Sequence, residues 1–164
     1  MTATFDAPPH RSRDLLPLAG FVLLCAAVAA VGGVATASSL PVWYAGLHKP
    51  AFNPPNWLFG PVWSVLYLMM AVAAWRVWRR REARGAALAL WGVQLALNFA
   101  WSLIFFGLKA PGPALLDLAL LLLAIAATAV AFERSDRTAA WMLAPYFAWC
   151  CFAFALNFEI WRLN

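Results

Sequence analysis

The sequence predicts an all-α membrane protein, a bundle of five transmembrane helices with a long Pro/Trp-rich loop between the first and second helices. Hydrophobic residues make up 65% of the 164 residues and charged residues only 12%, about half the charged share of a typical soluble domain. The mean hydropathy is +0.74. Five segments reach the length of about 20 mostly apolar residues that crosses a bilayer. They cover residues 15–36, 58–78, 86–108, 114–132 and 138–162.

The first segment follows a short tail, residues 1–14, and begins the single domain that we expect over residues 15–164. Small residues recur in it at four-residue spacing, at Ala29, Gly33 and Ala37. This spacing permits close helix packing and favours a scaffold role. Arginines ahead of an apolar run also resemble a cleavable secretory signal, but this run is longer than the usual core of about 7–15 residues. We therefore expect the segment to be retained as a helix.

Prolines and aromatic residues crowd the stretch from Leu40 to Trp63. The prolines are Pro41, Pro50, Pro54, Pro55 and Pro61, and the rings are Trp43, Tyr44, Phe52, Trp57, Phe59 and Trp63. Each proline fixes φ and restricts the residue before it, which predicts irregular backbone over most of the stretch. One buried ring removes roughly 150–250 Å² from water, so this many rings need a surface to cover. We expect residues 40–57 to form an ordered lid over one end of a pocket.

The second and fifth helices each present an aromatic face. On the second, we expect Pro61 in the first turn, where a missing N–H costs little. One side then carries Trp63, Tyr67 and Met70, by their i, i+4 and i+7 spacing. On the fifth, Pro145 predicts a bend. The residues that follow it on one side are Tyr146, Trp149, Ala153 and Asn157.

The third helix has two contrasting faces. One stripe contains Gln94, Asn98 and Trp101. Amide side chains at membrane depth either bond to neighbouring helices or face a polar or ligand-filled cavity, and the sequence leaves both interpretations open. Nearly opposite lies a stripe of small residues, which lets helix backbones approach closely and predicts a homodimer contact. Its members are Gly85, Ala89, Gly92, Ala96 and Ala100.

The fourth helix carries one acidic residue, Asp117, which we expect in its first turn. A carboxylate there is favoured by the helix dipole and can accept hydrogen bonds from free N–H groups. We therefore interpret Asp117 as a structural cap in preference to a proton relay. Cys25, Cys150 and Cys151 lie in apolar segments with no spacing that indicates a disulfide framework or a metal site.

The basic residues are unevenly distributed between the two sides of the predicted bundle. Nine of the twelve fall in the N-terminal tail and the second and fourth connections. By the positive-inside rule the N-terminus is cytoplasmic and the aromatic loop faces outward. The arginines sit at helix ends without a base-stacking platform, which argues against nucleic-acid binding. We expect a multi-pass protein of a bacterial inner membrane in preference to an outer membrane.

Three stretches together resemble a known family, the tryptophan-rich sensory protein or translocator protein family, also called the peripheral-type benzodiazepine receptor family. They read WYAGLHKPAFNPPNWLFGPVWSVLY, QLALNFAWSLIFFG and APYFAWCCFAFALNFEIWRLN. The resemblance covers the chain from about Leu15 onward. It implies a five-helix membrane bundle, commonly a homodimer, with a pocket for porphyrins such as protoporphyrin IX. It also implies that the pocket of animal members takes sterols and synthetic ligands.

The same resemblance implies pocket residues at matching positions of this chain. They are Tyr44, Pro54, Trp63, Tyr67, Asn98, Trp101, Trp149 and Ala153. The loop and the helix stripes add Trp57, Gln94 and Tyr146 to the predicted ligand site. The family's sterol-recognition pattern is incomplete here, because no Lys or Arg follows Tyr146 within five residues. We predict no catalytic residue, no metal site and no required cofactor.

Three functions remain open from the sequence. The leading one is a membrane protein that binds and senses a tetrapyrrole in an aromatic pocket. A transporter is the second, although the sequence shows neither two matching halves nor the intramembrane charges typical of transporters. Light-dependent porphyrin breakdown is the third. Without a nucleophile–base pair or a metal site, that chemistry would belong to the ligand and oxygen.

Overall fold

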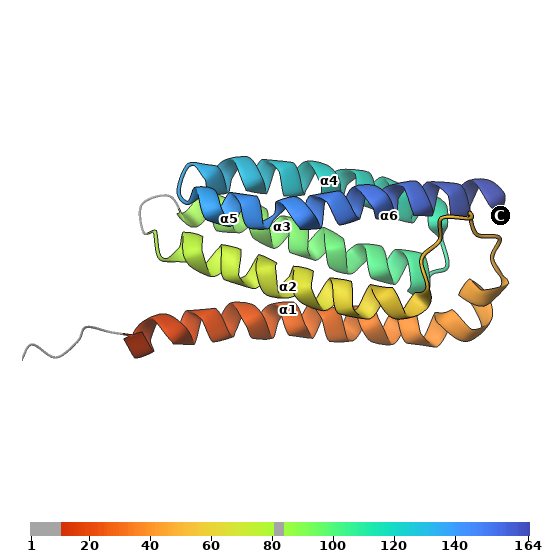
Figure 1. Cartoon of the computed structure of the whole chain (residues 1–164), viewed down its shortest axis with the longest axis horizontal. Helices are drawn as coiled ribbons and strands as arrows, with labels where there is room; N and C mark the ends of the chain where they lie inside the picture. Colours follow the sequence, from red (N-terminus) through yellow and green to blue (C-terminus); the bar gives the residue numbers. More distant parts are fainter. Residues whose placement is uncertain (1–10, 81–83) are drawn as a thin grey trace, which may run out of the picture.

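A computed structural model describes residues 11–80 and 84–164, and in this part of the chain the regular structure is entirely helical (Figure 1). The predicted tail lies outside the described residues except for 11–14. The elements are α1 (Arg11–Ser39), the π-helix η1 (Leu40–Tyr44), α2 (Asn56–Trp78), α3 (Arg84–Ser102), the π-helix η2 (Leu103–Gly107), α4 (Pro111–Glu133), α5 (Arg137–Met142) and α6 (Ala144–Leu163).

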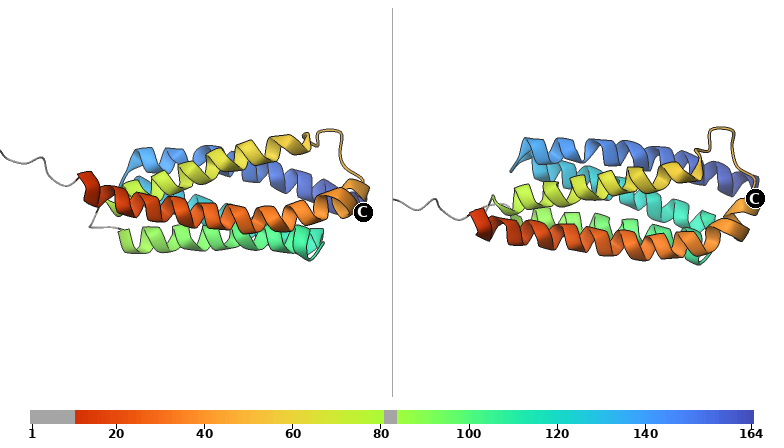
Figure 2. Two further views of the ribbon diagram at one scale, coloured as in Figure 1. Left: turned by 90° about the horizontal axis from the view of Figure 1, so that it is seen from below. Right: turned by 60° about the horizontal axis from the view of Figure 1, so that its bottom comes forward.

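Five of the described stretches are long and apolar enough to cross a membrane, so the predicted five-span all-α class is confirmed. They are Leu15–Tyr44, Asn56–Trp78, Gly85–Gly107, Pro111–Glu133 and Arg137–Leu163. The two views of Figure 2 show α1 along one side of the bundle, where it packs against α2 and α3. On the other side α4 packs against α3, α5 and α6.

The bundle has two distinct ends. The loop end contains η1, η2 and the connection from α1 to α2, and the arginine end contains the end of α2, the start of α3 and the connection from α4 to α5 (Figure 1). We use these two names below.

The first helix runs further than the sequence predicted. It was expected to end at residue 36, but α1 continues to Ser39 and directly into η1. Pro41 is tolerated because it lies in the first positions of η1, where the bonding register widens and the Ala45 N–H reaches back to the Leu40 carbonyl. The irregular connection is therefore residues 47–55, the 47–55 loop, which is shorter than the predicted 40–57.

Pro61 and Asp117 also lie further from the starts of their helices than the sequence predicted. Because α2 begins at Asn56, Pro61 lies beyond the first turn, where it removes one intrahelical hydrogen bond. Because α4 begins at Pro111, its first turn contains no acidic residue. The capping role predicted for Asp117 is therefore wrong, and this buried side chain lies in the second turn.

The structure shows a break in the fifth span near Pro145, where the sequence predicted a bend. The fifth span is divided into α5 and α6 at Leu143, two residues before the proline. Helical bonding continues across the break, since the Phe147 N–H donates to the Leu143 carbonyl at 2.9 Å. The missing N–H of Pro145 accounts for the break.

Small and apolar side chains fill the arginine end. The fully buried face of α2 consists of Met70, Ala71, Ala73, Ala74 and Val77. The Trp91 indole N–H of α3 donates to the Met70 carbonyl at 3.2 Å. The small side chains of Ala71, Ala73 and Ala74 let neighbouring helices approach closely, so this half of the bundle is densely packed.

Asp136 closes the arginine end as the N-cap of α5. Its carboxylate accepts the Ala139 N–H at 3.0 Å and lies 2.9 Å from the Arg76 guanidinium and 3.8 Å from that of Arg80. Burial raises the pKa of Asp136, but the Ala139 hydrogen bond and the two arginines outweigh it and hold this pKa below its ordinary value. The carboxylate therefore fastens α2 to α5 in its ionised form.

Candidate functional site

A cavity of about 300 Å³ lies between α1, α2, α3 and α6 toward the loop end. The α1 and η1 wall consists of Ala29, Gly32, Gly33, Thr36, Leu40 and Tyr44. The α2 wall consists of Asn56, Phe59, Gly60, Trp63, Ser64 and Tyr67. The remaining walls are Trp101, Ser102, Phe105 and Phe106 from α3 and η2, and Trp149, Ala153, Leu156, Asn157 and Ile160 from α6.

The two π-helices meet at the loop end of this cavity. Trp43 of η1 and Phe105 of η2 form an edge-to-face pair with ring centroids 5.4 Å apart. The buried Ser39 hydroxyl donates to the Phe106 carbonyl at 2.6 Å, which joins the end of α1 to η2. A π-turn is wider than an α-turn and often marks a functional site. Here both π-turns direct aromatic residues into the cavity wall.

Aromatic rings form most of the remaining wall. Trp63 lies 5.5 Å from Tyr67 between ring centroids, and Trp149 lies 5.9 Å from Phe59. Trp101 stacks on Phe105 at 5.3 Å with an angle of 22° between the ring planes. Because these rings already pack against one another, their side chains lose little conformational freedom when a flat ligand binds. Such a wall therefore suits a planar apolar molecule.

Several polar groups of the wall are already hydrogen bonded to the protein. The Trp101 indole N–H donates to Asn157 Oδ1 at 3.1 Å, and Asn157 Nδ2 donates to the Pro111 carbonyl at 2.8 Å. The Tyr67 hydroxyl donates to Asn98 Oδ1. Thr36 donates to its own helix at the Gly32 carbonyl. A ligand therefore meets a largely apolar surface, and it can bond to these polar groups only by replacing a hydrogen bond within the protein.

Six of the predicted ligand residues line the cavity: Tyr44, Trp63, Tyr67, Trp101, Trp149 and Ala153. Two others lie directly behind the wall. Asn98 accepts the Tyr67 hydrogen bond, and the Tyr146 ring packs edge-on against Trp63 at 6.2 Å. They support the lining side chains instead of facing the cavity.

Three predicted ligand residues lie away from the cavity wall. Trp57 is 71% exposed at the start of α2, and Pro54 belongs to the 47–55 loop. Gln94 is fully buried one turn from Asn98, and neither atom of its amide has a hydrogen-bond partner in the described structure. Its position on the Asn98 stripe does not bring it to the cavity, because it lies about two turns further from the loop end than Trp101, where the α3 part of the wall begins.

The α1 wall was missed by sequence reasoning. Ala29 and Gly33 were interpreted as packing residues, but they line the cavity with Gly32 and Thr36. A Cβ placed on Gly33 or Gly60 would meet no atom within 4 Å, so both glycines border open space. The signal was present as small-residue spacing, but that spacing does not distinguish a helix contact from a cavity wall.

The small-residue stripe on α3 faces away from the bundle. Gly85, Ala89, Gly92 and Ala96 are exposed, and Ala100 is half-buried. A Cβ on Gly85 or Gly92 would meet nothing within 4 Å. The stripe therefore takes no part in packing within the chain, and its role as a dimer contact stays a prediction.

Comparison with known proteins places these features in context. A family model described as TspO/MBR family matches residues 21–162. The chain is 40% identical over 157 residues to a tryptophan-rich protein TspO of Chlorobaculum tepidum, which covers 93% of this chain and 99% of that protein. It is 42% identical over 140 residues to a tryptophan-rich sensory protein of Cereibacter sphaeroides, covering 84% and 88%. It is 46% identical over 126 residues to the human translocator protein, covering 74% and 75%.

Proposed function

This chain belongs to the TspO/MBR family and is an integral multi-pass membrane protein, and on that premise we propose that it binds and senses a flat tetrapyrrole such as protoporphyrin IX. Relatives carry the names sensory protein and translocator protein, which fit a membrane sensor of a small molecule. The observation that supports the ligand class is the aromatic cavity wall built from Trp63, Trp101 and Trp149.

The chemistry of the wall favours a planar apolar macrocycle. No charged side chain is among the described lining residues. A tetrapyrrole would therefore place its rings against the tryptophans, and its carboxylates would have to point out of the cavity. The side between α1 and α2 is where we expect them to leave, since Gly33, Gly60 and Ser64 line the cavity and are also exposed on the bundle surface.

The size of the cavity adds a condition. About 300 Å³ is at the lower end of the range of roughly 300–1,000 Å³ typical of small-molecule sites. A complete macrocycle therefore requires the cavity to widen. The glycine-bordered side between α1 and α2 offers open space for this widening, since a Cβ at Gly33 or Gly60 would meet no atom within 4 Å.

Titration of the purified protein with protoporphyrin IX in the dark, followed by tryptophan emission, tests this function. We expect saturable quenching, since rings in the wall lie next to the bound ligand. Absence of saturable quenching would exclude tetrapyrrole binding. Two further arms separate the alternatives: new products after illumination would indicate light-dependent breakdown, and ligand uptake into sealed vesicles would indicate transport.

We also propose that the N-terminus is cytoplasmic and that the host membrane is a bacterial inner membrane. The ends of α2, α4 and α5 at the arginine end carry five arginines, Arg76, Arg79, Arg80, Arg134 and Arg137. The positive-inside rule places that end in the cytoplasm and the 47–55 loop outside. A phosphatase reporter fused after residue 164 should be active and a fluorescent protein fused there dark. The opposite pattern would reverse the orientation.

A further inference from the structure

The 47–55 loop begins and ends at the cavity. Tyr44, which precedes it, and Asn56, which follows it, both line the cavity. The loop is partly held by its own residues, because the Tyr44 hydroxyl donates to Asn53 Oδ1 at 2.8 Å. The Lys49 ammonium donates to the Ala45 and Leu47 carbonyls at 3.2 and 3.1 Å. These contacts shape the loop but do not attach it to another helix.

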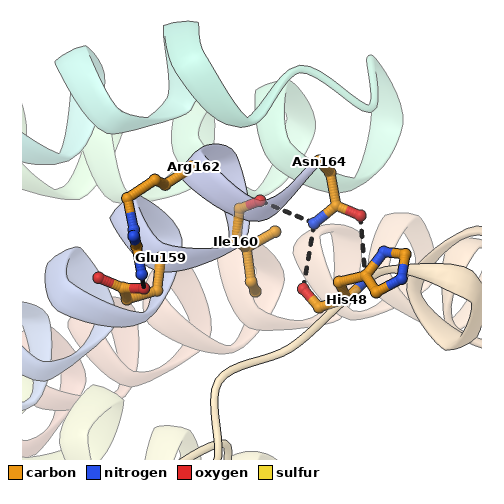
Figure 3. A network of polar contacts seen from close by, with 5 residues as sticks. All are labelled: His48, Glu159, Ile160, Arg162 and Asn164. Atoms are coloured by element: carbon orange, nitrogen blue, oxygen red, sulfur yellow. Dashed lines mark hydrogen bonds and ion pairs between the residues drawn. The ribbon is translucent and has the colours of Figure 1, made fainter.

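The attachment to a distant helix comes from Asn164, just beyond α6 (Figure 3). Asn164 Oδ1 accepts the backbone N–H of His48 at 3.0 Å, and Asn164 Nδ2 donates to the backbone carbonyl of the same residue at 3.0 Å. The second Nδ2 proton reaches the Ile160 carbonyl at 2.8 Å, in the last turn of α6. In the described part of the chain, the hydrogen bonds from the loop to a helix other than its neighbours all involve Asn164.

The amide is chemically matched to this position. An amide side chain carries one acceptor oxygen and two N–H donors. Here the oxygen faces the His48 N–H, while the nitrogen faces the carbonyls of His48 and Ile160. A flipped amide would set donor against donor and acceptor against acceptor. Ile160 itself lines the cavity, so Asn164 links the loop directly to a turn of the cavity wall.

We propose that Asn164 is a positioning residue that holds the 47–55 loop closed over the loop end of the cavity, and that its release controls ligand exchange. An apolar contact between Phe52 and Phe152, with centroids 6.2 Å apart, supports the same attachment to α6. The inference rests on the proposed function for its ligand part only. The attachment of the loop is a property of the ligand-free protein.

The first test therefore uses no ligand. Hydrogen–deuterium exchange of the intact protein should show faster exchange across residues 47–55 in Asn164→Ala, by about tenfold at the His48 amide, since one hydrogen bond to that N–H is lost. His48→Ala is the matched control and should exchange like the parent, because both bonds use the His48 backbone. Arg162→Ala removes the neighbouring ion pair with Glu159, which does not touch the loop, and should also match the parent (Figure 3).

The second test measures release of bound protoporphyrin IX by stopped flow in the same variants. Asn164→Ala should release it several-fold faster, while His48→Ala and Arg162→Ala should match the parent. Parent-like exchange at His48 in Asn164→Ala would overturn the attachment. Faster exchange with an unchanged release rate would overturn its control of the ligand. If the parent protein binds no porphyrin, the proposed function fails, while the exchange measurement still decides whether Asn164 holds the loop.

Discussion

The loop end and the arginine end of the bundle are built from different side chains and are filled differently. At the arginine end, the α2 face of Met70, Ala71, Ala73, Ala74 and Val77 is fully buried, and Asp136 fastens two helices with a charged cap. At the loop end, large rings contact one another edge-on and leave a cavity of about 300 Å³.

The difference shows how a single bundle combines stability with a binding site. Small residues bring helix backbones together and leave little space, whereas rings such as Trp63 and Trp149 hold the backbones apart. Two π-turns widen the loop end further. We therefore expect substitutions at the arginine end to change stability and those at the loop end to change ligand binding.

The largest expected effect tests the difference in packing. Ala74→Leu adds three carbon atoms at a position with 0% exposure, and should destabilise the fold by about 2 kcal/mol through overpacking. The matched change Ala153→Leu extends into the cavity and should cost much less stability while weakening porphyrin binding. Thermal unfolding in detergent compares the two. Equal losses would mean that the two ends are packed alike.

Next in size is the loss of an aromatic wall. Trp63→Ala or Trp149→Ala should weaken protoporphyrin IX binding about tenfold or more, since each ring facing a stacked ligand contributes roughly 1 kcal/mol beyond its buried area. Trp141→Ala is the control, because Trp141 is 66% exposed and absent from the described cavity wall. Unchanged affinity in both wall variants would show that the cavity is not the tetrapyrrole site.

Asp136→Asn tests the arginine end by pH. Asparagine keeps the N-cap of α5 but loses the ion pair, at a cost of about 1 kcal/mol, because Arg76 is partly exposed. The folded pKa of Asp136 lies below its unfolded value of about 3.9, so the parent's advantage is present above about pH 4 and is lost as pH falls through the folded pKa. Unfolding curves of both proteins from pH 7 to 3 should converge; a constant gap would contradict the ionised cap.

The smallest effect on the fold is expected on the outer face of α3. The side chain added by Gly92→Leu would point into open space, so the stability of the fold and ligand binding should stay close to the parent's values. If the small-residue stripe forms the homodimer contact, crosslinking of membranes should show loss of the dimer. A dimer as abundant as the parent's would remove the stripe from the interface.

The sequence already determined the elements of this fold and their local character. Apolar length predicted the five spans, and Pro145 predicted a bend in the span that the structure divides at Leu143. The concentration of rings between Leu40 and Trp63 indicated the end at which a site would lie. Each of these properties depends on one segment and the solvent around it, so each can be inferred without knowing the neighbouring helices.

Tertiary structure decided which side chains face the cavity. Helical spacing places Gln94, Asn98 and Trp101 on one stripe, but only Trp101 reaches the cavity wall. Ala29 and Gly33 could equally have packed against a helix, and Asn164 meets His48 across 116 residues of sequence. Periodicity gives a residue's angle about its own helix axis. The rotation and register of that helix against its neighbours depend on side chains from all of them, which meet only in the folded bundle.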